Sequence, residues 1–448
     1  MPHVAIMLPG IMGSVLKLDS EVIWPGPITS LFLPYKKMKE LMSDNLVATD
    51  CIRHYAVTNQ YQTLIDDLNT CGFDEQNGTL VVCAYDWRKD NAVSAETLAR
   101  HVEDASSRHG PDVEVSLVAH SMGGLVARHY LESGKFNTRP GFGRVRRLIT
   151  LGTPHNGAAI ALSVVLGHEK RLFLSKEQVF QASSDPRFPS AYQLLPPQGE
   201  PFAWNKAVGT ELGLLDIYEN DVATRLGLIS QNLDAAARFH RSLDVGRRPI
   251  QVRYFCFSGT QQTTATHVHI RQGGALATPD KIEEDGGGDG TVPTWSSFLP
   301  GIQRMFVGGE HSNIYRTPNL RRTLATILGK EGYLLGVPDE VQVAIRDKVV
   351  EPKDLVHVTI GFTAEIRDFS GVLTLERAKI DESTGHVTSY DPPAVVNRVT
   401  YSGLDVESIA LVFDAPNIRG IYRVSFRDEL EKPPSGYDEL IVQEPLKH

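Results

Sequence analysis

Ser121 stands where an apolar run at residues 113–119 gives way to a helix-forming stretch at residues 122–132, and this restricts the possible folds more than any other feature. An apolar run followed directly by a helix predicts a buried strand that turns sharply. Such a turn strains the residue at its apex, and the residues two positions before and after must be small. Ala119 and Gly123 meet this requirement. The segment therefore predicts a reactive serine in an α/β fold, with an ordinary small-residue turn as the alternative.

Similar apolar runs recur along the chain and predict further buried strands. Together with the first, they lie at residues 4–8, 80–85, 113–119, 145–151, 251–257 and 303–307. Helical patterns separate them, for example at residues 61–68 and 95–107. Strands of this kind that alternate with helices are typical of a mostly parallel sheet covered on both faces. Helical periodicity over about residues 158–245 predicts an inserted helical cap, and a helix near residues 320–328 would close this first domain.

The last hundred or so residues predict a small all-β, sandwich-like domain. Short strands separated by turn residues are expected at residues 356–363, 372–376, 396–401, 409–413 and 421–426. A length of 448 residues allows two to four domains. We predict two, at residues 1–335 and 352–448. The second domain carries no recognisable motif, and we expect it to be separable near Lys330 and to bind a protein partner or mediate oligomerisation.

Composition excludes some functions. The net charge of -9 argues against a nucleic-acid partner, because phosphate binding needs a basic surface. No run of about 18 apolar residues is present, so we expect no transmembrane helix. The first residues lack the basic and apolar regions of a signal peptide. We therefore expect a cytoplasmic protein.

The cysteines and clustered histidines predict no metal site. The four cysteines fit neither a disulfide framework nor a zinc pattern, so reduced, buried thiols are expected, and a Cys51–Cys71 bridge is the alternative. His267 and His269 could place two imidazoles on one face of a strand, but no third ligand accompanies them. We expect neither a metal nor another cofactor.

A nucleophilic serine needs a base and a group that orients the base. In hydrolases of this strand–turn–helix type, the serine is followed along the chain first by the acid and then by the histidine. Asp289 and His311 follow successive predicted strands in that order, and both would lie at the carboxyl edge of the sheet. Asp285 is the rival acid. His120 adjoins the serine but is expected to point away from it in such a turn, so it is not the expected base. His155 is expected to support the site, not to act as the base.

The developing oxyanion needs two backbone donors. One would be the Met122 N–H, directly after the serine. The loop at residues 9–14, PGIMGS, follows the first strand and could supply the second. Ile11 is the candidate there and Met12 the fallback. A glycine turn without a chemical role is the alternative reading of the loop.

Eight segments together resemble the lecithin:cholesterol acyltransferase-like family of α/β-hydrolases, which includes lysosomal phospholipase A2-type enzymes. These segments are 8–14 (LPGIMGS), 23–25 (IWP), 84–88 (AYDWR), 119–124 (AHSMGG), 152–157 (GTPHNG), 190–196 (SAYQLLP), 288–293 (GDGTVP) and 310–312 (EHS). The resemblance covers residues 1 to about 330 and has no counterpart for the C-terminal region. It implies an α/β-hydrolase fold and a metal-free reaction through a serine acyl-enzyme.

By motif position, the resemblance implies a catalytic triad: Ser121, Asp289 and His311. It also implies that Ile11 and Met122 form the oxyanion hole. Trp24 and Tyr85 lie in family segments and are expected to contact substrate, and packing beneath the site is the alternative for the segment at residues 85–88. The expected reaction is cleavage or transfer of acyl groups of lipid esters, such as phospholipids. A deacylase or amidase, or a catalytically weak binding module, is the alternative.

The substrate would meet apolar parts of the chain. Residues 158–166 and 28–35 are candidate walls of an acyl pocket, although both could equally be core. We expect the cap to make transient contact with a membrane or lipid surface, because an exposed apolar patch favours such contact.

Overall fold

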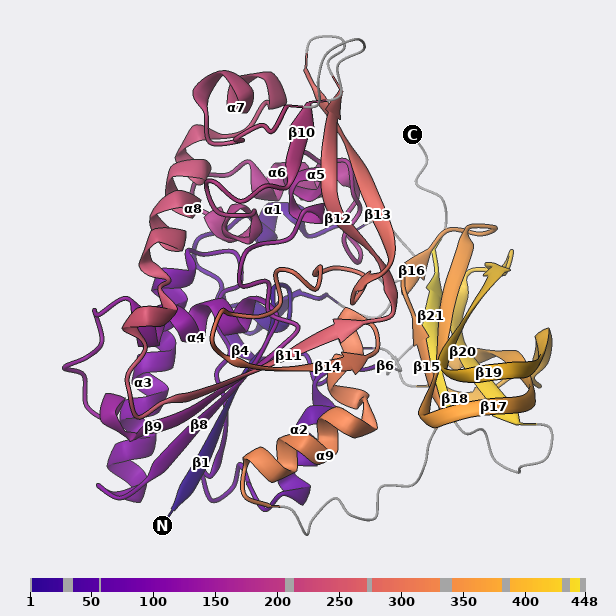
Figure 1. Ribbon diagram of the computed structural model, residues 1–448, viewed down its shortest axis with the longest axis horizontal. Helices are drawn as coiled ribbons and strands as arrows, with labels where there is room; N and C mark the ends of the chain where they lie inside the picture. The colour runs from indigo at the N-terminus through magenta and orange to yellow at the C-terminus, as the bar shows by residue number, and fades with distance from the viewer. Residues whose placement is uncertain are drawn as a thin grey trace.

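A six-stranded parallel sheet forms the centre of the computed structural model (Figure 1), which describes residues 2–26, 35–55, 58–205, 213–271, 276–330, 341–380, 387–428 and 436–443. The strand order is β14-β11-β9-β8-β1-β7. These strands are β1 (His3–Leu8), β7 (Leu80–Val82), β8 (Glu114–His120), β9 (Val145–Leu151), β11 (Arg253–Thr260) and β14 (Gln303–Gly308). Each corresponds to one of the six apolar runs, so the mostly parallel sheet expected from the sequence is confirmed.

Helices cover both faces of this sheet. Because side chains alternate along a strand, Ile6 of β1 packs on one side with α3 (Asn91–His109) and α4 (Met122–Glu132). Met7 packs on the other side with α2 (Gln62–Thr70) and α9 (Pro318–Ile327). Figure 1 shows α2 and α9 together on that face. The two buried layers explain why the strands are apolar at nearly every position.

Between β9 and β11 the chain forms the expected helical cap. Its helices are α5 (Ile160–Val165), α6 (Lys176–Ser183), α7 (Asn220–Leu226) and α8 (Ser230–Ser242). The structure adds a hairpin that we did not predict, formed by β12 (Gln262–Arg271) and β13 (Thr278–Gly288), and β12 also pairs with β10 (Ala203–Asn205). Threonine, histidine and acidic residues interrupt the apolar pattern by which these strands could have been recognised in the sequence. Nevertheless, Val268 and Ile270 pack into the apolar core of the cap.

Shorter elements complete the first domain. They are β2 (Ser14–Leu18), β3 (Glu21–Trp24), α1 (Met38–Leu41), β4 (Val47–Cys51), β5 (His54–Tyr55), β6 (Thr58–Asn59), η2 (Phe142–Arg144), η3 (Pro189–Leu194), η4 (Val245–Arg247) and η5 (His311–Arg316). Strands β3, β2 and β4 form a small antiparallel sheet after the first strand. Of the candidate pocket wall at residues 28–35, only Tyr35 falls within the described residues.

The C-terminal region is all β, as expected. Its strands are β15 (Gln342–Ile345), β16 (Val349–Val350), β17 (Leu355–Ile380), β18 (Val387–Tyr390), β19 (Ala394–Asp414), β20 (Gly420–Asp428) and β21 (Gly436–Val442). Two pairs of predicted short strands are pieces of the long strands β17 and β19, because irregularities in their pairing interrupt the apolar pattern. Strands β15 and β16 precede residue 352, so the sheet begins before the boundary we expected.

All four cysteines are buried free thiols, and no Cys51–Cys71 bridge is formed. Within the described ranges, no helix is both long and apolar enough to cross a membrane.

Candidate active site

Ser121 lies at the turn between β8 and α4 with backbone angles φ 53° and ψ -127°. This strained conformation raises its side chain above the carboxyl edge of the sheet. Position 123 requires glycine, because a Cβ there would lie 2.6 Å from the Pro9 carbonyl oxygen. The Ser121 N–H donates to the Leu151 carbonyl on the neighbouring strand at 2.9 Å, which fixes the turn to the sheet. The sharp turn expected from the small flanking residues is therefore present.

The structure brings His311 and Asp289 to this serine. The Nε2 atom of His311 lies 2.9 Å from Ser121 Oγ, and its Nδ1 atom lies 2.7 Å from Asp289 Oδ2. Asp289 is fully buried, and its Oδ1 atom accepts the backbone N–H groups of Thr291 and Val292 at 3.0 and 2.7 Å. These bonds hold the carboxylate in one orientation. The three side chains thus have the geometry for serine deprotonation by an oriented imidazole.

The rival acid lies elsewhere. Asp285 is exposed on β13, where it accepts the hydroxyl of Thr263 at 2.8 Å. His267 and His269 neighbour each other on β12, and no cluster of three or more His, Cys, Asp or Glu suited to a metal occurs among the described residues.

The other two histidines of the motifs are buried beside the site. His155 contacts Thr150 Oγ1 at 3.2 Å and does not approach the serine through its imidazole. His120 uses Nε2 to contact the His311 carbonyl oxygen at 2.9 Å. Burial lowers the pKa of His120 to about 3, so the ring is neutral near pH 7. His120 therefore supports the loop that carries His311.

Tyr61 connects this support to the loop after β1, and sequence analysis did not identify it. Its hydroxyl accepts the Gly10 N–H and lies within hydrogen-bond distance of His120 Nδ1, both at 2.8 Å. With His120 neutral and its Nε2 donating to a carbonyl, the tyrosine hydroxyl must donate to Nδ1. A single tyrosine at the start of an amphipathic helix gives no sequence signal for such a bridge.

The loop at residues 9–14 passes directly over the serine. A Cβ at Gly10 would lie 2.8 Å from the Ser121 Cβ, so only glycine allows this approach. Ile11 and Met12 both line the same cavity as the serine. Met12 has φ 60°, and its carbonyl accepts the Trp24 indole N–H at 2.8 Å. The hydrogen bond from Trp24 thus stabilises the conformation of the loop.

Trp24 and Tyr85 pack against the loop at residues 9–14. Both are buried, and neither is among the described residues that line the cavity. The Tyr85 hydroxyl donates to the Pro9 carbonyl at 2.7 Å, as the Trp24 indole does to Met12. These side chains hold the loop above the serine, and substrate contact by either one stays a prediction.

A cavity of about 310 Å³ opens onto Ser121 and His311. The cap contributes apolar side chains to it, including Ala161, Val164, Phe173, Leu174, Val179 and Leu194. The segment at residues 158–166 is therefore part of its wall, as one of our alternatives proposed. Such a lining suits an aliphatic chain.

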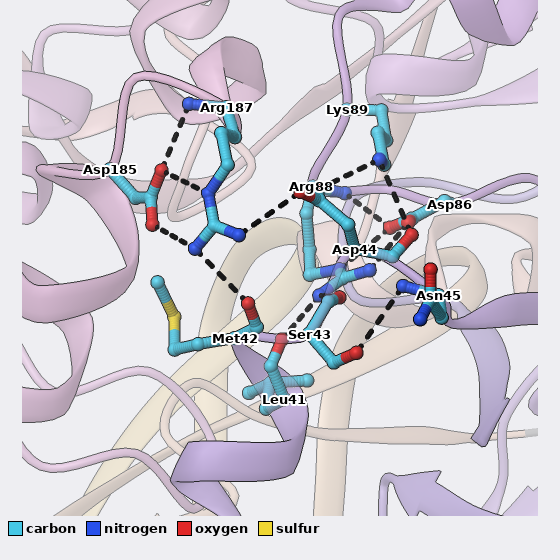
Figure 2. Close-up of polar contacts among 10 residues, drawn as sticks. All are labelled: Leu41, Met42, Ser43, Asp44, Asn45, Asp86, Arg88, Lys89, Asp185 and Arg187. Atoms are coloured by element: carbon cyan, nitrogen blue, oxygen red, sulfur yellow. Dashed lines mark hydrogen bonds and ion pairs between the residues drawn. The ribbon is translucent and has the colours of Figure 1, made fainter.

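Figure 2 shows a polar cluster formed by Arg88 and Arg187 with residues 41–45. Leu41, Met42 and Arg88 of this cluster also line the cavity. Arg88 pairs with Asp86 at 2.6 Å and donates to the Leu41 and Ser43 carbonyls. Arg187 pairs with Asp185 at 2.6 Å and with Asp44 at 3.1 Å. Although Arg88 also lines the cavity, its charge is balanced by a carboxylate, and the cluster joins the loop to the cap.

The charges around His311 favour its protonated form. Burial alone would lower the pKa of His311, but the Asp289 carboxylate outweighs burial and raises the pKa above its ordinary value. Glu310 acts in the same direction, and Arg171 opposes it. Since a general base must be neutral, kcat/KM for any reaction that uses this base should rise with pH through the raised pKa.

Glu310→Gln should move this acidic limb of the pH profile to lower pH. Burial raises the pKa of Glu310 to about 7, so its carboxyl is partly ionised near neutral pH. Removing that negative charge destabilises the imidazolium and lowers the pKa of His311. The measurement is kcat/KM against pH, with Glu96→Gln on the exposed face of α3 as the control. An unchanged limb in Glu310→Gln would contradict the electrostatic account.

Residues 44–244 match the family described as lecithin:cholesterol acyltransferase. The resemblance inferred from the motifs is thereby confirmed. The matched range includes Ser121 and nearly all of the expected cap but ends before Asp289 and His311. It supports an acyl-ester hydrolase or acyltransferase, while the roles of the other two residues depend on geometry.

Comparison with solved structures identifies the fold. The crystal structure of a Tle4-Tli4 complex is similar to this chain with a TM-score of 0.51 and 15% identity, covering 75% of this chain and 99% of that chain. A gene lin2722 product of Listeria innocua has a TM-score of 0.32 at 14% identity, with 74% and 95% covered. The metagenomic carboxyl esterase MGS0156 has a TM-score of 0.34 at 13% identity, with 74% and 76% covered. The chain has the α/β-hydrolase fold, followed by a C-terminal β region. A search of curated proteins gives no significant match.

Proposed function

From the premise that residues 44–244 match the lecithin:cholesterol acyltransferase family, we propose that the protein is a serine hydrolase that cleaves lipid esters through an acyl-enzyme. The observation that carries the proposal is the array of Ser121, His311 and Asp289 at the floor of an apolar cavity. A polar array of this kind at the end of an apolar pocket suits an ester that joins an aliphatic acyl chain to a polar alcohol.

In the proposed first half-reaction, His311 Nε2 takes the proton of Ser121 Oγ as this oxygen attacks the ester carbonyl carbon. The backbone N–H groups of Ile11 and Met122 stabilise the oxyanion. Asp289 holds the imidazole and stabilises its cation. When the tetrahedral intermediate collapses, the C–O bond to the alcohol breaks and the imidazolium returns its proton to the leaving oxygen.

The second half-reaction releases the acyl group from Ser121. His311 deprotonates a water molecule, whose oxygen attacks the acyl carbonyl, and then returns the proton to the serine oxygen. The products are a carboxylic acid and free enzyme. An acceptor alcohol could replace water in the same step, and the reaction would then be acyl transfer. We propose hydrolysis as the main outcome, because none of the described residues that line the cavity forms a recognisable acceptor site for an alcohol.

Arg171 suggests which alcohol leaves. It lines the cavity, and the described cavity-lining residues include no carboxylate. Among the described residues its guanidinium donates to the Lys170 carbonyl at 3.1 Å and forms no ion pair with an acid. Glu169 and Asp347 lie near enough to oppose the lowering of its pKa by burial, but Glu169 is paired with Lys281 at 2.8 Å. Arg171 is thus the cavity's incompletely balanced cation.

Arg171 lines the same cavity as Ser121 and His311, and its charge acts on His311. An anionic group on the alcohol half of the substrate would meet this guanidinium. We therefore propose that the preferred substrates are esters whose alcohol carries a phosphate, as in glycerophospholipids.

Arg171→Gln should selectively weaken turnover of phospholipids. Short-chain phosphatidylcholine and the diacylglycerol of equal chain length, both below their micellar concentrations, would be compared by kcat/KM. A hydrogen bond to a charged group contributes about 1.5–3 kcal/mol, so the preference for phospholipid should fall by roughly 10- to 100-fold. Arg187→Gln is the matched control, because Asp185 and Asp44 already balance that charge.

The outcomes separate the parts of the proposal. Equal turnover of both lipids by the wild type would contradict the phosphate preference and leave ester hydrolysis intact. Turnover of acyl amides in place of esters would instead identify a deacylase or amidase. If the wild type turns over none of these substrates, the hydrolase proposal itself fails and a binding module takes its place.

A further inference from the structure

The C-terminal β sheet packs against the first domain through a continuous apolar core. Ala378, Ile421 and Ile441 of this sheet belong to the same buried cluster as Trp24 and Leu174 of the first domain. Exposing such a surface by removing the sheet would be unfavourable. This shared core argues against the separable domain that we expected from the sequence.

Polar contacts surround this apolar interface. Thr359 of β17 donates to the Gln262 side chain at 2.9 Å, and Arg346 pairs with Glu283 at 2.8 Å. Lys170, which precedes the cavity residue Arg171, pairs with Glu351. The C-terminal sheet therefore contacts both the β12–β13 hairpin and a segment of the cavity wall.

One carboxylate of the sheet reaches the turn that carries His311. Asp438 of β21 is completely buried. Its Oδ1 atom lies 3.7 Å from the Arg316 guanidinium, and its Oδ2 atom accepts the Asn313 side-chain amide at 3.5 Å. Both partners belong to η5, the turn that begins at His311. The negative charge of Asp438 raises the pKa of Arg316, which burial lowers.

Asp438 is itself held rigidly within its own domain. Its carboxylate accepts the Lys348 ammonium at 2.9 Å and the Ile345 N–H at 2.9 Å. A second contact secures the same turn, since the Gln342 side-chain amide donates to the Arg316 carbonyl at 2.7 Å. Together these bonds tie both ends of Arg316, its carbonyl and its guanidinium, to the C-terminal sheet.

We infer that the C-terminal β domain is a fixed part of the catalytic apparatus and that Asp438 is a positioning residue for His311. The inference rests on the proposed role of His311 as general base. Without Asp438, the partly buried Arg316 would lose one compensating carboxylate, and the turn would shift to relieve it. A displacement of about 1 Å at a catalytic group can cost on the order of 100-fold in rate.

Asp438→Asn tests this inference in the full-length protein. We expect kcat for a soluble p-nitrophenyl ester to fall by about 10-fold or more, with KM changed by less than about twofold, because the base is displaced and the cavity is not. The rate of fluorophosphonate labelling at Ser121 should fall in parallel. The matched control is Glu376→Gln, which removes a carboxylate paired with Arg423 at 2.6 Å within the same sheet.

The thermal unfolding temperatures of Asp438→Asn and Glu376→Gln would be measured first. The kinetics would then be recorded well below both temperatures, so that a loss of activity cannot result from unfolding. If Asp438→Asn does not fold, Gln342→Leu replaces it, because this change removes only the bond to the Arg316 carbonyl. For Gln342→Leu we expect a smaller loss of kcat, about threefold or more, again without a change in KM. A folded variant with wild-type kcat would overturn the inference, as would an equal loss in Glu376→Gln. An inactive wild type would contradict the proposed function instead.

Discussion

Ser121→Ala is expected to lower kcat for ester hydrolysis by about 10⁴-fold or more. Alanine has no oxygen to attack the carbonyl, and neither His311 nor the oxyanion donors can supply a covalent intermediate. The substitution leaves the strained turn otherwise unchanged, so the protein should fold and bind substrate as before. Turnover of a p-nitrophenyl ester and thermal unfolding are the two measurements.

Ser133→Ala at the other end of α4 is the control for this change, and its kcat should match the wild type. If Ser121→Ala retained more than a tenth of wild-type turnover, another nucleophile would be at work and the proposed mechanism would be wrong.

Asp289→Asn should cost about 10⁴-fold in kcat, mostly without a change in KM. An amide nitrogen in place of Oδ2 cannot accept the N–H of His311 Nδ1, so the imidazole adopts the wrong tautomer toward Ser121. The amide can still keep the backbone bonds from Thr291 and Val292 through its oxygen. The rate of ester turnover at saturating substrate measures the effect.

Asp285→Asn is the matched control, because both acids belong to one glycine-rich stretch and only Asp289 contacts His311. We expect wild-type kcat from this variant. A large loss in Asp285→Asn together with a small one in Asp289→Asn would assign the orienting role to the rival acid.

The sequence predicts the central sheet well because burial on both faces leaves a strong local signal. Residues 145–151, for example, are apolar at most positions and form β9 (Val145–Leu151). The β12–β13 hairpin gives no such signal, since polar residues such as His269 and Asp280 pair across its two strands and interrupt the apolar pattern. Strands β17 and β19 were divided into shorter pieces because polar residues and pairing irregularities interrupt them. Their length depends on the partner strands, which a local pattern does not contain.

Among the residues of the site, too, those with a local sequence signal could be predicted, and those that reach the site from distant segments could not. Ser121 could be identified because the turn imposes strict limits on residues within two positions of it. Tyr61, Arg171 and Asp438 could not, since each reaches the surroundings of the serine from a distant segment of the chain. Asp438 lies in a domain for which the motifs give no counterpart, so only the packed structure connects it with Asn313 and Arg316 of the turn that begins at His311.

The most direct test of the proposed acyl-enzyme mechanism is to identify the residue that a fluorophosphonate modifies. The wild-type protein would be treated with the reagent, digested and analysed by mass spectrometry. We predict a single adduct, on the peptide that contains Ser121. The fraction of protein modified at this peptide should equal the fraction of ester turnover that is lost. Complete inactivation with the adduct on a different residue, or full turnover by protein already modified at Ser121, would contradict the account.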